Sequence, residues 1–292
     1  MLNNFIYHLR LIKGQIFQEP LNKGHRLKLA MDYSRWILLY KYNQKDWHIR
    51  FDNGFRSIVK PFPDHDSGSM NIWTRNVDFY DLEFVRRVLR KGDKIIDAGC
   101  NVGNRTWALA DIIGGAILID ANQKAIERVR ENLVLNRLPE GKYTAIQKAL
   151  GDKEGIIRFS DRGGARTDNK VLGEDEDTQS EAFTTIEMTT IDTIVSTYDY
   201  APAYMKIDVE GYDLLALKGA INTLTSGTVR LVKFELLDIG SLQEFYDFFS
   251  AIGWKLFALD ENGSPTAKEE YFESLNLFAS PVHYADQYLN RV

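Results

Sequence analysis

The chain has 292 residues, of which 44% are hydrophobic and 26% charged, a composition typical of a globular protein. Its apolar runs fall far short of the roughly 18 residues that a membrane-spanning helix needs, and its first residues lack the pattern of a secretory signal peptide. The single cysteine, Cys100, excludes an intrachain disulfide and a cysteine-based zinc site. We therefore expect a cytoplasmic protein without a membrane span.

The charge is distributed unevenly along the chain. The net charge is −5, but residues 1–60 contain 11 Lys or Arg against 4 Asp or Glu, whereas the remainder contains 25 against 37. A basic segment of this kind can attract an oppositely charged partner. Its basic residues are interleaved with core-type aromatics, which favours packing on the acidic remainder or on another subunit. We therefore expect residues 1–75 to form an N-terminal extension that covers the substrate or makes a homo-oligomer contact.

Secondary structure is predicted from the spacing of apolar residues. Residues 1–75 are irregular in pattern, apart from a hairpin predicted within 48–59 about the Asn53-Gly54 turn. Apolar residues recur at helical spacing over 78–89, and beyond Gly92 buried strands alternate with helices. The predicted strands are residues 94–97, 116–120, 143–146, 204–209, 230–235, 254–259 and 275–279. The predicted helices after Gly92 are residues 104–113, 122–137, 214–224 and 241–252.

This alternation predicts the fold class. Strand–helix–strand connections imply parallel pairing through right-handed crossovers, hence a doubly wound α/β sheet of seven strands within residues 76–292. The last two strands predict an antiparallel hairpin at the sheet edge. Residues 151–190 are a polar insertion with a short strand over 155–159. Within it, residues 161–181 are expected to be a loop over the site, a plain surface insertion or a disordered segment.

A glycine-rich turn follows the first strand of this sheet. Gly99 and Gly103 remove side chains where the backbone must turn sharply and approach a ligand, just after Asp97. The next helix offers backbone N–H groups to the carboxylate end of a cofactor. Asp120 ends the neighbouring strand, where its carboxylate can accept hydrogen bonds from both ribose hydroxyls. The predicted cofactor-binding residues are Asp97, Gly99, Cys100, Asn101, Gly103, Thr106, Asp120 and Ala121.

Charged residues end two further strands at the same edge. Lys206, Asp208 and Glu210 alternate along the fourth strand, so they share one side of it if the strand stays extended. Such charges are costly unless they pair or lie in a solvated cleft. The structural alternative is an ion pair of Lys206 with a carboxylate, together with a helix-start acid at Glu210 that favours the helix dipole, but the ligand edge of the sheet favours a functional cluster. Glu235 ends the fifth strand and is either a further member or a simple strand end. The candidate catalytic residues are Asp208, Glu210, Lys206 and Glu235.

Five short motifs occur in order along the chain. They are Asp97-x-Gly-x-Asn-x-Gly103, Asn132-x-x-x-Asn136, Ala149-Leu-Gly-Asp152, Thr190-Ile-Asp192 and Lys206-Ile-Asp-Val-Glu-Gly211. Together they resemble the FkbM-type methyltransferases over about residues 78–236. The resemblance implies a class I, Rossmann-like methyltransferase that uses S-adenosylmethionine for O-methylation, often of hydroxyls on sugars or polyketide-type natural products. Members commonly have Glu-Pro where this chain has Asp120-Ala121, and the shorter acid keeps the charge.

The O-methylation implied by this resemblance requires the acceptor hydroxyl to lose its proton. A sugar hydroxyl is a poor nucleophile until a base or a metal assists its deprotonation. We expect Asp208, Glu210 or Glu235 to act as the base or to orient the hydroxyl, while Lys206 pairs with a carboxylate or an acidic substrate. A divalent metal on Asp208 and Glu210 is a further option, although two carboxylates do not define a site.

The expected acceptor is a small molecule or a glycan. Nucleic acid is not expected, because the body of the chain is acidic. The alternatives are a nucleic-acid or protein methyltransferase, an oxidoreductase that binds NAD or a nucleotide sugar, and a non-catalytic subunit that keeps the fold.

Overall fold

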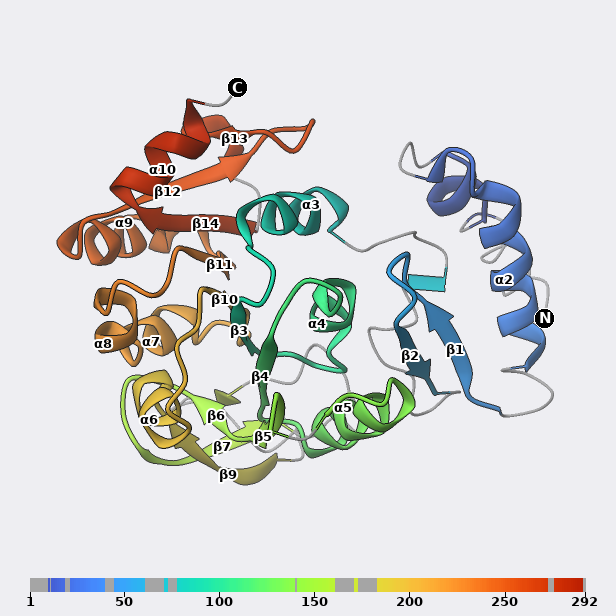
Figure 1. Cartoon of the computed structure of the whole chain (residues 1–292), viewed down its shortest axis with the longest axis horizontal. Helices are drawn as coiled ribbons and strands as arrows, with labels where there is room; N and C mark the ends of the chain where they lie inside the picture. The colour runs from blue at the N-terminus through green and yellow to red at the C-terminus, as the bar shows by residue number, and fades with distance from the viewer. Residues whose placement is uncertain are drawn as a thin grey trace.

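The computed structural model describes residues 10, 12–18, 22–39, 45–60, 71–72, 78–139, 141–160, 171–172, 183–272 and 276–290. Its centre is an eight-stranded sheet (Figure 1). The strands are β3 (Lys94–Ala98), β4 (Gly115–Asp120), β5 (Tyr143–Gln147), β10 (Tyr204–Ile207), β11 (Leu231–Glu235), β12 (Trp254–Leu259), β13 (Pro265–Thr266) and β14 (Asn276–Pro281). They lie in the order β13-β12-β14-β11-β10-β3-β4-β5.

The pairing of these strands confirms the predicted α/β class. The strands β11, β10, β3, β4 and β5 pair in parallel, and β14 lies antiparallel between β11 and β12. The predicted seven strands and the terminal antiparallel hairpin are therefore present, and β13 adds an eighth, two-residue strand. This is a doubly wound, Rossmann-like α/β sheet.

Helices cover both faces of the sheet, over two separate apolar cores. Alternation along each strand sends Ile95 and Tyr204 into one core and Ile96 and Met205 into the other. The first core is covered by α3 (Phe79–Val88), α4 (Asn104–Leu109), α5 (Gln123–Leu135) and α10 (Val282–Leu289). The second is covered by α6 (Ile191–Thr197), α7 (Asp213–Lys218), α8 (Ile221–Thr225) and α9 (Leu242–Ala251).

The predicted polar insertion contains a second sheet. Its strands β6 (Ala149–Leu150), β7 (Gly155–Ser160), β8 (Val171–Leu172) and β9 (Phe183–Thr189) lie in the order β6-β9-β7-β8. The strand predicted at 155–159 is confirmed as β7. The sequence did not predict β9, because only Ile186, Met188 and Thr189 of its 7 residues are buried. The loop predicted at 161–181 lies outside the described residues, except for β8.

The N-terminal part is more regular than its sequence indicates. The predicted hairpin is confirmed as β1 (Trp47–Arg50) and β2 (Arg56–Val59), which pair antiparallel. It is preceded by the π-helix η1 (Ile12–Phe17) and by α2 (Arg26–Leu38), so the expectation of irregular structure is wrong for these residues. In α2, apolar residues lie on the exposed side as well as on the buried side, which obscures the helical periodicity.

Some helix boundaries also differ from the prediction. α4 ends at Leu109 rather than at residue 113. The helix predicted over 214–224 is divided into α7 and α8 at Gly219, where a Cβ would lie 2.0 Å from the carbonyl oxygen of Gly151. The short helices α6 and α10 were not predicted. Within the described part of the chain, no helix is long and apolar enough to cross a membrane.

Two asparagines of α5 attach the hairpin to the large sheet. Asn132 is fully buried, accepts a hydrogen bond from the Ile58 N–H at 2.9 Å and donates one to the Val102 carbonyl at 3.1 Å. One turn later, Asn136 accepts from the Arg56 N–H at 2.8 Å and donates to the Arg56 carbonyl at 2.7 Å. A spacing of four places both amides on one side of the helix, along the edge of β2. Because Val102 belongs to the glycine-rich turn, Asn132 also joins the hairpin to that turn.

Replacing Asn132 with alanine tests this connection. The change leaves the Ile58 N–H and the Val102 carbonyl buried without their side-chain partner, so we expect a loss of about 2–4 kcal/mol of unfolding free energy. The matched variant Asn136→Ala lies in a more exposed place and is expected to lose about 1 kcal/mol. Urea denaturation measures both values, and equal losses in the two variants would contradict the special role of Asn132.

Candidate active site

The carboxyl ends of β3, β4, β10 and β11 bring the predicted site residues to one edge of the sheet. The strand register places Lys206 between Asp97 on β3 and Lys233 on β11. Asp120 is the last residue of β4, and Glu235 is the last residue of β11. Because ligands of open α/β sheets bind outside this edge, we place the candidate active site here.

The glycine-rich turn is tied to the end of β4 by hydrogen bonds. The N–H groups of Gly99 and Cys100 donate to the Ile119 carbonyl at 2.8 and 3.0 Å. The N–H of Asn101, a residue in the left-handed conformation with φ 48°, donates to the Asp120 carboxylate at 2.8 Å. The carboxylate of Asp120 therefore helps to hold the turn in shape before any ligand is considered.

Both glycines of the turn are required by close contacts within the protein. Gly99 and Gly103 have φ values of 68° and 82°, a region that side chains rarely adopt. A Cβ on Gly103 would lie 2.6 Å from the ring of Trp107, and a Cβ on Gly99 would lie 1.7 Å from the carbonyl oxygen of Asp208. The space at both positions is taken by the protein itself, so the ligand approach inferred from the sequence is not the only reason for glycine. Because Gly99 has no side chain, the turn can pack directly against the segment that follows β10.

Three of the predicted cofactor-binding residues point into the protein. Asp97, Cys100 and Thr106 are buried, and the Thr106 hydroxyl donates to one Asp97 carboxylate oxygen at 2.7 Å. The other Asp97 oxygen is buried 3.7 Å from the Lys206 ammonium and accepts no hydrogen bond from the described residues. Burial raises the pKa of the Cys100 thiol well above its usual value. This thiol is therefore neutral at ordinary pH.

Asp120 combines a structural and a possible ligand-binding use. Its two oxygens accept hydrogen bonds from the N–H groups of Asn101 and Asn122, each at 2.8 Å. Burial raises the pKa of Asp120 to about 6, although both hydrogen bonds oppose the rise. Each carboxylate oxygen has a second lone pair, so the group can still accept hydrogen bonds from ligand hydroxyls. Ala121 follows directly and is half-buried.

Lys206 is the centre of the charges at this edge. Its ammonium donates to the Gly99 carbonyl at 2.5 Å and lies 3.1 Å from the Asp208 carboxylate and 3.7 Å from Asp97. Burial alone would lower the pKa of Lys206, but Asp208 and Asp97 outweigh it and leave this pKa raised. The ammonium thus stays charged and holds the glycine-rich turn next to Asp208.

The chain bends where the sequence predicted a continuous strand. β10 ends at Ile207, and Glu210 is left-handed with φ 53°, so the expected alternation of Lys206, Asp208 and Glu210 along one extended strand is wrong. The bend still brings three carboxylates together: one carboxylate oxygen from each of Asp208, Glu210 and Glu235 lies within 4.8 Å of the other two. Of the side chains that the structure describes, this is the one group spaced to hold a metal ion.

The crowding of carboxylates changes their protonation. Burial, together with Asp208, Glu210 and Asp213, raises the pKa of Glu235 to about 7. Burial would also raise the pKa of Asp208, but the charge of Lys206 outweighs it and leaves this pKa lowered. Asp208 therefore stays ionised at neutral pH, while Glu235 holds its proton to a higher pH than an ordinary glutamate does.

Sequence reasoning missed Asp213, which joins two strand ends. This buried residue accepts hydrogen bonds from the N–H groups of Val209 and Glu235, both at 3.2 Å. Burial raises its pKa to about 6, with a further contribution from Asp208. An acid in the first turn of a helix is common, so its position in the sequence was not a specific signal.

A second charged cluster, also missed, lies beside Lys206 on the same face of the sheet. The Lys233 ammonium is 2.7 Å from Asp81 and 3.8 Å from Asp78, and Arg105 pairs with Asp78. Burial and the charge of Arg105 lower the pKa of Lys233. Burial would raise the pKa of Asp78, but Lys233 and Arg105 outweigh it and lower this pKa. A lysine within an apolar strand predicts an acidic partner, but the sequence does not say which acid it is.

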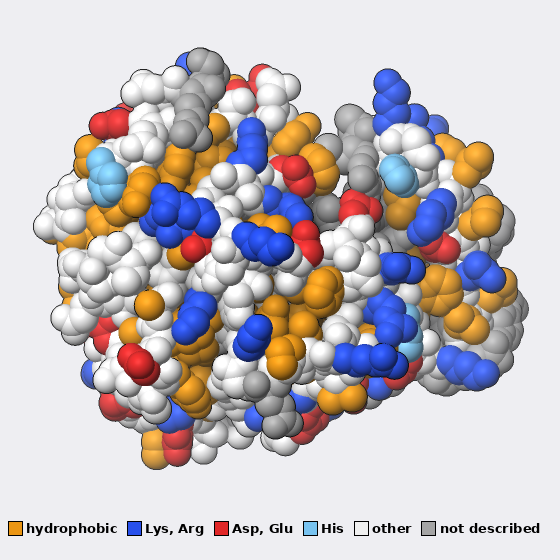
Figure 2. All heavy atoms as spheres, viewed as in Figure 1, with side chains coloured by type: hydrophobic (Ala, Val, Ile, Leu, Met, Phe, Trp, Pro, Cys, Tyr) orange, Lys and Arg blue, Asp and Glu red, His pale blue; other side chains and the backbone are white. Residues whose placement is uncertain are grey.

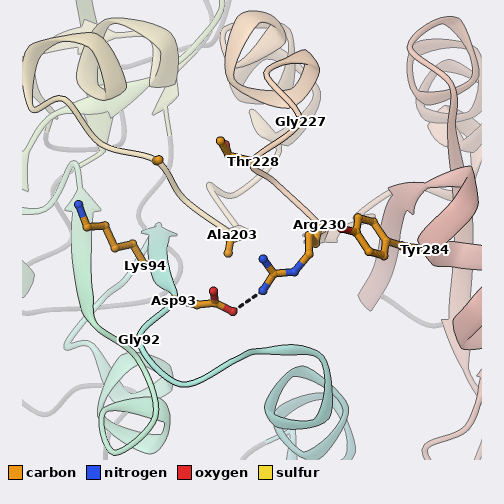
Figure 3. Close-up of a pocket in the computed structure, with 9 residues that line it drawn as sticks. Gly92, Asp93, Lys94, Ala203, Gly227, Thr228, Arg230 and Tyr284 are labelled. Carbon is orange, nitrogen blue, oxygen red and sulfur yellow. Dashed lines mark hydrogen bonds and ion pairs between the residues drawn. The ribbon is translucent and has the colours of Figure 1, made fainter.

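A hollow of 420 Å³ lies at the opposite edge of the sheet (Figure 3). Its lining includes Lys94 at the start of β3, Ala203 before β10 and Arg230 before β11. Arg230 forms an ion pair with Asp93 there. Because sheets of this class bind ligands outside the carboxyl ends of their strands, we do not place the active site in this hollow.

The sequence matches the family model described as "Methyltransferase FkbM domain" over residues 97–256, which is more than half of the chain. The chain belongs to the FkbM methyltransferase family. The match begins at Asp97 and includes Asp120, Lys206 and Glu235, so it spans both sides of the candidate site. No curated protein matches this FkbM-family sequence.

Solved structures that match part of this chain include a methyltransferase and a putative methyltransferase. The crystal structure of Methyltransferase FkbM from Methylobacillus flagellatus KT is 16% identical, with 69% of this chain and 47% of that chain covered and a TM-score of 0.49. A putative methyltransferase from Streptococcus mutans, in complex with SAH, is 11% identical, with 69% and 96% covered and a TM-score of 0.40. This FkbM-family chain therefore spans less than half the length of the Methylobacillus protein.

The crowding at Gly99 can be tested with a matched pair of glycines. Gly253 has a similar φ of 72° but nothing within 4 Å of its missing Cβ. We expect Gly253→Ala to lose about 1–2 kcal/mol of unfolding free energy from backbone strain alone. Gly99→Ala should lose a further 1–3 kcal/mol or more, roughly, because its Cβ meets the Asp208 carbonyl. Chemical denaturation of both variants measures the difference, and similar losses would contradict the contact.

Proposed function

We propose that the chain is an S-adenosylmethionine-dependent O-methyltransferase that acts on a hydroxyl group of a sugar, glycan or natural-product acceptor. One observation carries the proposal: Glu235, Asp208 and Glu210 converge beside the glycine-rich turn, and the pKa of Glu235 is raised to about 7. A group with this pKa can accept a proton at neutral pH and release it again. Membership of the FkbM family supports methyl transfer as the reaction.

The residues beside the turn suit the polar groups of S-adenosylmethionine. The buried Asp97 oxygen without a hydrogen bond from the described residues can accept one from the ammonium of the methionine part. Asp120 can accept hydrogen bonds from the ribose hydroxyls through its remaining lone pairs. The turn from Gly99 to Gly103 would lie along the cofactor, with Ala121 next to the ribose. When bound, S-adenosylmethionine supplies an activated methyl group.

The chain's own residues would then prepare the acceptor. Methyl transfer is an in-line displacement, so holding the hydroxyl in line with the methyl group supplies much of the rate. Glu235 accepts the hydroxyl proton as the oxygen–carbon bond forms and the bond from the methyl carbon to the cofactor's sulfur breaks, with its electron pair going to the sulfur. Asp208, kept ionised by Lys206, orients the hydroxyl, and its repulsion of a second negative charge raises the proton affinity of the ionised Glu235 carboxylate, which makes that carboxylate a stronger base. Glu210 adds to the same repulsion.

A divalent metal is a second way to use the same carboxylates. The spacing within 4.8 Å of Asp208, Glu210 and Glu235 is the specific observation that favours it. Three carboxylate oxygens suit a hard cation such as magnesium, which would lower the pKa of the acceptor hydroxyl directly. The two readings differ in their consequences, because a bound cation would also lower the pKa of Glu235 and remove its titration near pH 7.

Cofactor binding gives the first test of the proposal. We expect the affinity for S-adenosylmethionine, measured by calorimetry, to fall as the pH drops through about 6, because protonation of Asp120 removes an acceptor for the ribose hydroxyls. Asp120→Asn should weaken binding by about tenfold at pH 7.5, roughly the value of one hydrogen bond to a charged group, and should flatten the pH dependence. Asp247→Asn, an exposed residue of α9, is the control. Unchanged affinity in Asp120→Asn would contradict the role of Asp120.

Catalysis gives the second test, once incubation with labelled S-adenosylmethionine and a panel of nucleotide sugars, glycans and polyols has found an acceptor. We expect kcat to rise with pH through about 7, as Glu235 becomes ionised. Glu235→Gln should remove this rise and lower kcat by about 10²–10⁴-fold, whereas the exposed control Glu244→Gln should change neither.

A chelator separates the base from the metal reading. Activity that survives a chelator supports Glu235 as the base, and activity restored by magnesium supports the metal. Methyl transfer to RNA or protein, and to no member of the panel, would contradict the proposed class of acceptor. A chain that binds NAD but not S-adenosylmethionine would contradict methyl transfer itself.

A further inference from the structure

The helix α2 carries two opposite apolar faces. Leu29 and Tyr33 are buried in the core of the extension. Leu27, Met31 and Leu38 are 74%, 60% and 56% exposed. At 100° per residue these three side chains fall within a narrow stripe, about 16 Å long, on the side of the helix away from Leu29 and Tyr33. The stripe is therefore a regular feature of the helix and not a scatter of single exposed residues.

Basic side chains lie along one flank of this stripe and on the adjoining segments. Lys28 and Arg35 lie on one flank of it, and both are exposed. Lys13, Lys23 and Arg10 add further exposed positive charge on the adjoining segments. In the described residues of 10–39 there are six Lys or Arg against one acid, Asp32, which pairs with Lys28 at 2.8 Å. The stripe and its surroundings thus form a basic, apolar surface.

This surface lies at one end of the molecule's longest axis, farthest from the helices α6 to α9 (Figure 1). Figure 2 shows Lys, Arg and hydrophobic side chains interspersed over that end. Residues 61–292 carry the opposite charge, with 25 Lys or Arg against 37 Asp or Glu. An anionic surface would therefore attract the α2 end and repel the body, which fixes one orientation of approach.

We propose that α2 docks on the anionic surface of a lipid bilayer, with Leu27, Met31 and Leu38 in the headgroup region and the basic side chains on the lipid phosphates. A helix with an apolar stripe and flanking Lys and Arg residues has the pattern of an interfacial helix that lies on a membrane without crossing it. A bilayer accepts side chains that project from a convex helix, whereas a protein partner must supply a matching apolar groove. Charge and shape therefore favour lipid over a second copy of this chain, and the proposal is independent of the proposed reaction.

Flotation of the full chain with lipid vesicles tests the proposal. We expect binding to vesicles of phosphatidylcholine mixed with phosphatidylglycerol, little binding to phosphatidylcholine alone, and release as the salt concentration rises. The triple variant Leu27→Ser, Met31→Ser, Leu38→Ser keeps the charge but should weaken binding by about tenfold or more. The double variant Lys23→Glu, Arg35→Glu keeps the stripe and should weaken binding similarly.

Matched controls come from the body of the protein. Val134→Ser removes an apolar side chain that is 79% exposed on α5, and Lys153→Glu reverses an exposed charge, and neither should change vesicle binding. Circular dichroism and the thermal midpoint show whether each variant is folded. Failure of the folded chain to bind anionic vesicles, or equal binding by the α2 variants, overturns the proposal. A dimer in light scattering that the triple variant abolishes, without vesicle binding, would assign the stripe to self-association instead.

Discussion

One buried ammonium holds the two halves of the candidate site together. Lys206 contacts the carbonyl of Gly99 in the glycine-rich turn, the carboxylate of Asp97 at the end of β3 and the carboxylate of Asp208 after β10. A charge at 5% exposure is stable only with such partners, so these groups cannot separate without a large loss of free energy. Gly99 shows how closely these groups pack, because the Asp208 carbonyl oxygen occupies the space that a side chain at residue 99 would need.

The other charged side chains at this edge of the sheet determine which carboxyl groups are ionised. The cations are Lys206, Lys233 and Arg105, and the acids are Asp78, Asp81, Asp97, Asp208, Glu210, Asp213 and Glu235. Acids exceed cations, so some carboxyl groups must hold protons more tightly than usual. Asp78, beside Arg105 and Lys233, and Asp208, beside Lys206, keep lowered pKa values, whereas the pKa values of Asp213 and Glu235 rise to about 6 and 7. A proton available near neutral pH is thus a consequence of burial together with the excess of acids over cations.

The sequence was informative where local pattern decides the structure. Apolar runs and their spacing located all seven long strands of the sheet, and Asp97 and Asp120 lie at the carboxyl ends of two neighbouring strands, as predicted. It was less informative where tertiary contacts decide. The bend at Glu210 places a non-glycine residue at φ 53°, which no local pattern indicates. The partner of Lys233 is Asp81, more than a hundred residues away in the chain, and only the fold brings the two together.

The position of β14 has a consequence for the smallest fragment that can fold on its own. The family match ends at Leu256, within β12, but β14 lies between β11 and β12 in the sheet. A fragment limited to the matched residues would lack an interior strand, not a peripheral one, and its β11 would present an open edge. It would also lack Asp81, which leaves the buried Lys233 without its nearest acid. The segment that matches the family by sequence is therefore shorter than the unit that must be kept whole when the protein is expressed or shortened.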